Sequence, residues 1–260
     1  MFPLKGRRIL VTRSAEQAAS FTNCIEQQSG ISVEIPLLYF KSVPSLENMD
    51  ILRRLNTFKW IIFTSSNGVH FFMELCERYQ IPLSVIKERS IAAVGRKTAN
   101  TLAYYNVETN FMPDTYTGEA LGEAFLNERY HGAVLVVQGN LARQKVVETI
   151  RPYMEVETAI MYETCVNVKI KEDFNRALQE NQLDALTFTS PSTVKAFIQL
   201  IEPSLFEHIQ STLCMCIGPT TEKEAEQAGF THRVIPEHQT VEGMCEALGS
   251  YFREKGNDDQ

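Results

Sequence analysis

An internal repeat constrains the fold of this chain more than any other feature of its sequence. The block at residues 63–72, FTSSNGVHFF, resembles the block at residues 188–197, FTSPSTVKAF. Further pairs of blocks follow the same order at nearly the same spacing: 6–11 with 132–137, 33–39 with 156–162, 93–98 with 216–221, and 113–119 with 236–242. This spacing indicates two copies of one structural unit of about 125 residues.

Within each copy, short apolar runs alternate with stretches of helical periodicity. Residues 69–76, for example, are apolar at the i, i+3, i+4 and i+7 positions that form the inward face of an amphipathic helix. The predicted strands are 8–12, 33–38, 60–64, 90–94 and 108–112 in the first copy, and 133–138, 156–161, 185–189, 213–217 and 232–235 in the second. Alternation of helices with continuously apolar strands predicts parallel sheets covered on both faces. We therefore predict an α/β protein with two flavodoxin-like, five-stranded sheets rather than one closed barrel.

The composition excludes several classes of partner. The 25 Lys and Arg residues are outnumbered by 32 Asp and Glu residues, and the net charge of -7 opposes binding to nucleic acid. No apolar run approaches the roughly 20 residues that a membrane helix needs, and residues 1–13 lack the apolar segment of a signal peptide. The six cysteines show no metal-binding spacing. We expect a monomeric cytoplasmic protein with reduced core thiols that binds neither nucleic acid nor membrane.

Small polar residues follow the predicted strands in both copies. In open parallel sheets, ligands bind beyond the carboxyl ends of the strands, where helix N-termini present unpaired N–H groups to anions. An acidic protein can therefore still bind carboxylates or phosphates. The alternative is that these Ser, Thr and Asn residues are only helix N-caps. Because the loops are paired across the repeat, we favour binding of a polyanion between the two domains. The loops are 12–14, 64–68, 95–98, 138–140, 189–193 and 218–221.

Tyr162 is the candidate for a catalytic proton donor. It ends the long predicted strand of the second copy and is paired with Tyr39 in the first copy. Its phenol can donate a proton to a leaving group, or it can be a half-buried ring that anchors the strand. The sequence contains neither a P-loop nor a dinucleotide-binding glycine motif, which argues against a nucleotide-using enzyme.

Several segments, taken in order, carry a resemblance to a known family. They are 9–13, 63–69, 94–95 with 98–99, 139–140 with Arg143, Tyr162, 188–192 and 217–221. Through their order and spacing, the chain resembles the uroporphyrinogen-III synthase family over nearly its whole length. The resemblance implies two α/β domains, one formed by residues 1–36 and 166–260 and the other by residues 41–161. It also implies that two long strands, near 33–40 and 156–165, cross between the domains.

The resemblance further implies a reaction in tetrapyrrole (heme) biosynthesis. Such a lyase cyclises hydroxymethylbilane to uroporphyrinogen III, with loss of water and inversion of ring D through a spirocyclic intermediate, and it uses no metal or organic cofactor. A substrate rich in carboxylates agrees with the loops described above. Tyr162 would be the catalytic proton donor. The residues expected to bind substrate are Arg13, Ser65, Ser66, Arg96, Thr98, Gly139, Asn140, Arg143, Ser190, Ser192, Gly218, Thr220 and Thr221.

A protein of another class remains possible on the sequence alone. Two similar α/β lobes also occur in binding proteins, so the alternative is a non-enzymatic, bilobal cytoplasmic binder of an anionic small molecule. A cytoplasmic sensor of this kind normally carries a fused DNA-binding domain, and the length of the chain leaves no room for one. The enzyme is therefore the favoured expectation.

Overall fold

The chain divides into two units, and each unit contains one sheet. The computed structural model describes residues 3–258, apart from the side chains of residues 15, 16 and 255–258. Within this range, unit 1 consists of the residues up to Tyr39 and from Cys165 onward, and unit 2 is Phe40–Thr164. The chain enters unit 2 within strand β3 (Leu38–Ser42) and leaves it within β7 (Val156–Val166). The prediction of two five-stranded α/β sheets is confirmed.

Strands from both ends of the chain form the sheet of unit 1. Its strands are β1 (Arg8–Val11), β2 (Ile31–Glu34), β8 (Ala185–Phe188), β9 (Leu213–Cys216) and β10 (Arg233–Val234). They lie in the order β2-β1-β8-β9-β10, and all their pairings are parallel. This is the flavodoxin-like order, in which the first strand lies second from the edge, between β2 and β8. As a result, Ile9 is paired with Ala185 across a long sequence separation.

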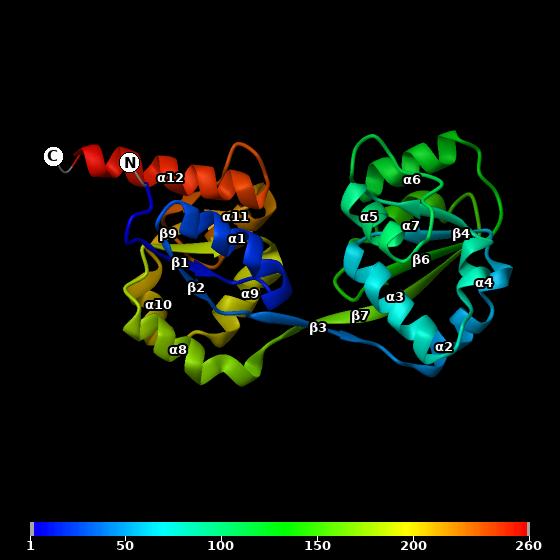
Figure 1. The fold of residues 1–260 in the computed structure, drawn as a ribbon, viewed down its shortest axis with the longest axis horizontal. Helices are drawn as coiled ribbons and strands as arrows, with labels where there is room; N and C mark the ends of the chain where they lie inside the picture. The colour runs from blue at the N-terminus through cyan, green and yellow to red at the C-terminus, as the bar shows by residue number, and fades with distance from the viewer. Residues whose placement is uncertain (1–2, 259–260) are drawn as a thin grey trace. The chain divides into compact units, whose positions relative to one another are not determined.

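Helices cover both faces of this sheet (Figure 1). One face packs against α1 (Ala15–Gln27) and α12 (Val241–Asp258), and the other against α8 (Lys171–Glu180), α9 (Pro191–Leu200) and α11 (Pro219–Gln227). The short elements η2 (Val168–Ile170) and α10 (Pro203–Ile209) complete the unit. Successive residues of β1 point to opposite faces, so Leu10 belongs to one apolar core while Ile9 and Val11 belong to the other.

The sheet of unit 2 has the order β3-β7-β6-β4-β5. Its other strands are β4 (Trp60–Phe63), β5 (Ser90–Ala93) and β6 (Val134–Gly139). One face packs against α2 (Leu46–Arg53), α3 (Ser66–Arg78), α4 (Leu83–Lys87) and α5 (Arg96–Tyr104), with η1 (Leu55–Thr57) beside them. The other face packs against α6 (Gly118–Asn127) and α7 (Lys145–Ile150). On α3, Val69, Phe72 and Cys76 are buried, as the helical periodicity predicts.

Two of the strand predictions are wrong. Residues 108–112 form no strand, and only Phe111 makes an isolated bridge to Ala92. The side chain of Asn110 accepts a hydrogen bond from the N–H of Ile91 at 2.7 Å, so it replaces a backbone partner in the ladder. The predicted strand 33–38 is instead divided into β2 and β3 around Pro36, which has no N–H to donate. Strand β3 therefore takes the fifth place in the sheet of unit 2.

Among the other predicted strands, only β7 has an end that differs from the prediction by more than one residue. Strand β7 continues to Val166, beyond the predicted end at residue 161, and β10 has only two residues.

All six cysteines carry free thiols, and Cys24 and Cys165 are only partly buried. No helix among the described residues is both long and apolar enough to cross a membrane.

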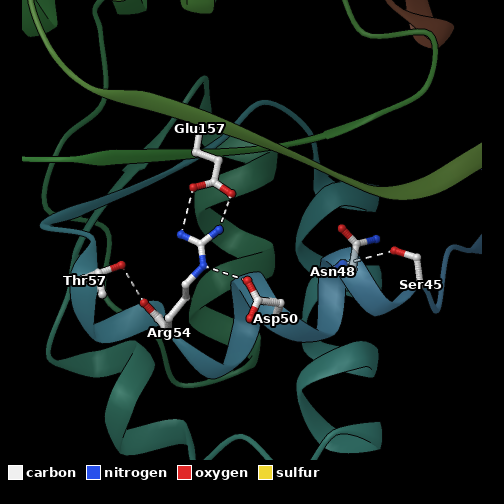
Figure 2. A network of polar contacts seen from close by, with 6 residues as sticks. All are labelled: Ser45, Asn48, Asp50, Arg54, Thr57 and Glu157. Carbon is white, nitrogen blue, oxygen red and sulfur yellow. Dashed lines mark hydrogen bonds and ion pairs between the residues drawn. The ribbon is translucent and has the colours of Figure 1, made fainter.

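A polar network fixes β7 to α2 (Figure 2). Arg54, the C-cap residue of α2, donates two hydrogen bonds to Glu157 of β7, at 2.9 and 2.5 Å, and one to Asp50 at 3.0 Å. The buried amide of Asn48 donates to the carbonyl groups of Val43 and Ile160, both at 2.8 Å. Strand β7 is thus held at Glu157 and again at Ile160, shortly before Tyr162.

We expect the buried amide of Asn48 to contribute more to stability than the ion pairs of Arg54. Asn48→Leu leaves the carbonyl groups of Val43 and Ile160 without this donor, and should lower the free energy of unfolding by about 1–3 kcal/mol. Arg54→Met should cost about 1 kcal/mol or less, because the side chain of Arg54 is 39% exposed and its ion pairs are screened by water. Urea unfolding of both variants measures the difference. A larger loss for Arg54→Met would contradict this ranking.

Candidate functional site

A pocket of about 350 Å³ lies at the carboxyl ends of the strands of unit 2. Parallel strands bring all their carboxyl ends to one edge of a sheet, and a crevice opens there where the strand order reverses, here between β6 and β4. The pocket is formed by the ends of β4, β5 and β7, the start of α6 and the loop from β6 to α7. Its lining residues are Thr64, Ser65, Val94, Thr117, Gly118, Glu119, Leu141, Ala142, Arg143, Lys145, Val146, Tyr162 and Thr164.

Tyr162 brings an enclosed aromatic ring to this pocket. It is 9% exposed, and its ring stacks on Phe71 of α3 with 5.2 Å between the ring centroids. Phe40 meets the same ring edge-on at 5.8 Å. The phenol oxygen lies 3.2 Å from the hydroxyl oxygen of Ser65. The ring is therefore held by apolar contacts, while its hydroxyl lies at the polar edge of the pocket.

Gly139 makes room for this ring. A Cβ atom built on Gly139 would lie 2.5 Å from Cζ of Tyr162 and 2.8 Å from its hydroxyl oxygen, much closer than a carbon atom can approach. Only a glycine therefore leaves space for the phenol in this position. The backbone of Gly139 acts as a support under the ring.

An irregularity between β6 and β7 aligns these two residues. The register pairs Gln138 with Ile160 but Gly139 with Tyr162, so β7 carries one extra residue, Met161, at this point. A bulge of this kind can place consecutive side chains on the same face of a sheet. Met161 belongs to the core under α3, and Tyr162 stacks on α3 as well. Without the extra residue, regular alternation would turn the phenol toward the opposite face.

The surroundings of Tyr162 keep it protonated. Burial raises the pKa of the Tyr162 phenol above its ordinary value, and the hydrogen bond with Ser65 opposes this only in part. A phenol whose pKa lies above that of a free tyrosine carries its proton at neutral pH. Tyr162 can thus act as a proton donor, but not as a base, in the resting protein.

The charged side chains of the pocket are not equivalent. Lys145 lies 3.5 Å from Glu119 and 3.7 Å from Glu148, so its charge is largely compensated. Arg143, in contrast, makes no ion pair with any described residue. Its guanidinium group can therefore pair with a ligand carboxylate, whose planar geometry it matches well.

Helices α3, α6 and α7 begin at the pocket, and the first two have side-chain caps. The hydroxyl of Ser65 accepts a hydrogen bond from the N–H of Gly68 at 3.0 Å and caps α3, and Thr117 caps α6 through the N–H of Ala120 at 3.1 Å. The cap satisfies only one of the orphan N–H groups of a helix, so the N–H of Ser66 at the start of α3 stays free for a ligand. The anion-binding and N-cap interpretations of these loops are therefore compatible.

The same capping contacts recur in unit 1. Ser190 caps α9 through the N–H of Thr193 at 3.2 Å, as Ser65 caps α3. Thr240 accepts from Gly243 at 3.0 Å, as Thr117 accepts from Ala120. A Cβ atom on Gly218 would lie 2.6 Å from the side-chain oxygen of Gln239, just as a Cβ atom on Gly95 would lie 3.0 Å from Cβ of Tyr116. The repeat in the sequence is thus also a repeat of local structure.

The two units differ in the donors that they present to an anion. The first residues of α9 and α11 are Pro191 and Pro219, which have no N–H group. The corresponding residues of unit 2, Ser66 in α3 and Arg96 in α5, each carry one. The edge of unit 2 therefore presents more backbone donors than the edge of unit 1.

In unit 2, the structure brings only part of the predicted site together. Ser65, Arg143 and Tyr162 line one pocket, with Gly139 under the tyrosine ring. Asn140 has a different contact, because its side-chain oxygen accepts a hydrogen bond from the N–H of Thr164 at 2.9 Å.

Two predicted residues of α5 lie outside the lining of the pocket. Arg96 lies over the ring of Tyr116 at 6.0 Å. Thr98 is 4% exposed and lies within the first turn of the helix. Thr221, its counterpart in unit 1, is 1% exposed.

The predicted residues of unit 1 lie at the carboxyl edge of its own sheet. Arg13 follows β1 and donates to Gln17 at 3.0 Å, while its Nε atom and the hydroxyl of Ser14 are buried without a partner among the described residues. Burial lowers the pKa of Arg13, and the nearby Glu242 carboxylate opposes this shift. Ser190 and Ser192 are hydrogen-bonded to each other at 2.9 Å. The remaining predicted residues, Gly218, Thr220 and Thr221, form the start of α11.

Several lining residues of the pocket are absent from the sequence-based predictions. Thr117, Gly118 and Glu119 belong to a block that recurs as residues 240–242, so the repeat contained a signal for them. Lys145 and Thr164 lie outside every recurring block, and no pattern in the sequence distinguishes them.

Comparisons with known proteins agree with one another. The family model described as uroporphyrinogen-III synthase HemD matches residues 19–246. The uroporphyrinogen-III synthase of Chlorobaculum parvum is 28% identical over 268 residues, covering 95% of this chain and 100% of the relative. The uroporphyrinogen-III synthase of Synechococcus elongatus is 25% identical over 259 residues, covering 97% of this chain and 98% of the relative.

Solved structures show the same fold at lower identity. The uroporphyrinogen-III synthetase of Helicobacter pylori is similar with a TM-score of 0.66 and 17% identity, covering 95% of this chain and 99% of that protein. A mutant uroporphyrinogen III synthase of Thermus thermophilus has a TM-score of 0.65 and 16% identity, with coverages of 96% and 100%.

The contact between Gly139 and Tyr162 can be tested through stability. Gly139→Ala introduces a methyl group where the ring lies, and should lower the free energy of unfolding by about 1–3 kcal/mol. The same substitution in a Tyr162→Leu background should cost much less, because the ring is then absent. Urea unfolding of the single and double variants gives this coupling. Equal costs in both backgrounds would show that Gly139 does not support the ring.

Proposed function

Because the chain belongs to the uroporphyrinogen-III synthase family, whose model matches residues 19–246, we propose that the unit 2 pocket contributes to closing hydroxymethylbilane into uroporphyrinogen III. The protein is a hydro-lyase of tetrapyrrole biosynthesis. The observation that carries the assignment of the site is the protonated, enclosed phenol of Tyr162 at the edge of a pocket that also contains the Arg143 guanidinium. We further propose that the protein acts as a cytoplasmic monomer on this small molecule.

The carboxylates of the substrate find complementary groups at the edge of unit 2. Arg143 supplies the uncompensated positive charge, and the N–H groups at the starts of α3 and α5, at Ser66 and Arg96, supply donors. For unit 1, the proposal concerns the corresponding loop residues, with fewer backbone donors available. They are Arg13, Ser190, Ser192, Gly218, Thr220 and Thr221.

Asn140 and Thr98 are proposed to act differently from the other residues. Asn140 holds the N–H of Thr164 and thereby shapes the pocket wall, and Thr98 lies buried in the first turn of α5. Neither side chain is positioned as a free group at the pocket surface. Their contribution is the geometry of the loops whose backbone groups meet the substrate.

Tyr162 is proposed to protonate the leaving hydroxyl of the substrate. The phenol O–H bond breaks, the proton joins the hydroxyl group, and the carbon–oxygen bond breaks to release water and leave a cationic azafulvene. The substituted carbon of ring D then bonds to the azafulvene carbon and forms the spirocyclic intermediate. The bond from this ring D carbon to its original bridging carbon breaks, and the bridging carbon bonds to the free carbon of ring D. When the macrocycle closes, the carbon that forms the last bond loses a proton, which restores the phenol. The reaction is a net loss of one water molecule.

Positioning contributes as much as proton transfer in this proposal. The azafulvene is reactive and would close at the free carbon of ring D if the substrate were not held. The pocket combines polar groups with the apolar residues Val94, Leu141 and Val146. We propose that the polar groups hold the carboxylates while the apolar groups reduce the access of water to the reactive carbon.

The decisive experiment separates isomers of the product. Purified protein incubated with hydroxymethylbilane should yield the type III isomer, whereas the spontaneous reaction yields the type I isomer by closure without inversion. After oxidation to porphyrins, chromatography distinguishes the two isomers. Binding of the bilane with only the type I product would show that the protein is a binder and not the synthase.

The role of Tyr162 is tested by comparing two substitutions. Tyr162→Phe keeps the ring but removes the proton, and should lower kcat by about 10²-fold with little effect on the melting temperature. Tyr162→Ala should in addition destabilise the unit by leaving a cavity. Tyr39→Phe is a matched control, because Tyr39 is the repeat counterpart of Tyr162 but is 44% exposed. Near-normal turnover of Tyr162→Phe would reject the acid role.

A further inference from the structure

Ser65 connects the start of α3 to the phenol of Tyr162. Its hydroxyl oxygen accepts the N–H of Gly68 at 3.0 Å and lies 3.2 Å from the phenol oxygen. Both Ser65 and Tyr162 line the same pocket. The serine hydroxyl is thus already engaged on the protein side, and it is the hydrogen-bond partner of the phenol within the described chain.

The apolar contacts of Tyr162 cannot orient its hydroxyl group. Phe71 stacks on the ring, Phe40 meets its edge, and Gly139 lies beneath it, and these contacts fix the plane of the ring. They leave the direction of the O–H bond undetermined, because they offer it no acceptor. The hydrogen bond with Ser65 is the described contact that depends on the direction of the phenol O–H bond.

A serine hydroxyl can either accept or donate a hydrogen bond, so it can partner the phenol both before and after the phenol loses its proton. One lone pair of the Ser65 oxygen is used by the N–H of Gly68, and a second lone pair and the hydroxyl proton remain. The hydroxyl can accept from the phenol at rest and donate to the phenolate after the proton has left. A hydrogen bond to a charged oxygen is stronger than one to a neutral oxygen, so this contact favours the phenolate.

We infer that Ser65 is a positioning residue that acts through Tyr162: its hydroxyl orients the phenol and then donates to the phenolate formed when the leaving hydroxyl takes the phenol proton. This inference rests on the proposed acid role of Tyr162. It also replaces the expectation that the Ser65 side chain binds a substrate carboxylate. No other co-reactant is involved, because the proton returns to the phenol when the macrocycle closes.

The corresponding serine of unit 1 does not have this arrangement. Ser190 caps α9 in the same way, but its hydroxyl is bonded to Ser192 at 2.9 Å and, among the described residues, to no tyrosine. The contact between a capping serine and a phenol is therefore not a by-product of the repeated cap. It occurs where β7 carries Tyr162 to the carboxyl edge of the sheet.

The first test compares variants of Ser65 with a matched loss of a helix cap. Ser65→Ala should lower kcat by about tenfold or more with little change in KM, because a hydrogen bond to a developing charge is lost. Ser65→Thr retains the hydroxyl and should restore most of the turnover. Ser45→Ala removes the cap of α2, in which the Ser45 hydroxyl accepts a hydrogen bond from the N–H of Asn48. Ser45 lies outside the pocket lining, so this variant should change stability but not kcat. A raised KM with normal kcat for Ser65→Ala would show substrate binding instead and overturn the inference.

A double variant distinguishes this inference from the proposed acid role. In a Tyr162→Phe background, Ser65→Ala should lower kcat no further, because the group on which Ser65 acts is absent. If Tyr162→Phe is impaired and Ser65→Ala lowers kcat by the same factor in both backgrounds, the inference is overturned and the acid role stands. If Tyr162→Phe turns over normally, the acid role fails and the inference fails with it.

Discussion

The seating of the Tyr162 ring on the bare backbone of Gly139 is the contact on which the rest of the site depends. The ring can lie there because β7 carries one residue more than β6 at this point, which turns the phenol toward α3. From that position its hydroxyl reaches Ser65, and burial keeps its proton in place. A side chain on Gly139 would displace the ring and break this chain of contacts at its start.

The site is held by structure that takes no part in the chemistry. Arg54 and Asn48 fix β7 to α2 at Glu157 and Ile160, shortly before the bulge. A reaction that depends on holding a reactive ring in one orientation needs such support, since small displacements of a positioned group reduce its effect strongly. The exposed ion pairs set the geometry of the strand, while the buried amide also carries part of its stability.

The internal repeat gives two units that have similar helix caps but present different chemical groups at their sheet edges. Ser65 and Ser190 cap equivalent helices, and Thr117 and Thr240 cap another equivalent pair. Proline at the first position of two helices of unit 1 removes N–H groups that unit 2 keeps. Tyr39, the counterpart of Tyr162, is exposed. Unit 2 is therefore the unit in which the repeated scaffold holds an enclosed phenol, the proton donor that we propose.

The sequence by itself determined the two sheets, the helix faces and the polar loops at the strand ends, because these follow from periodicity and capping within short segments. Ser65, which belongs to one of those loops, lines one pocket together with Arg143 and Tyr162, which lie outside them. Only the tertiary structure decided that the fifth strand is β3, at the edge beside β7, and not residues 108–112, which meet β5 at the opposite edge. It alone also decided that Lys145 and Thr164 line the pocket. It also decided which face Tyr162 occupies. That face depends on a one-residue register shift between strands, and such a shift is set by pairing across the sheet, which no local pattern records.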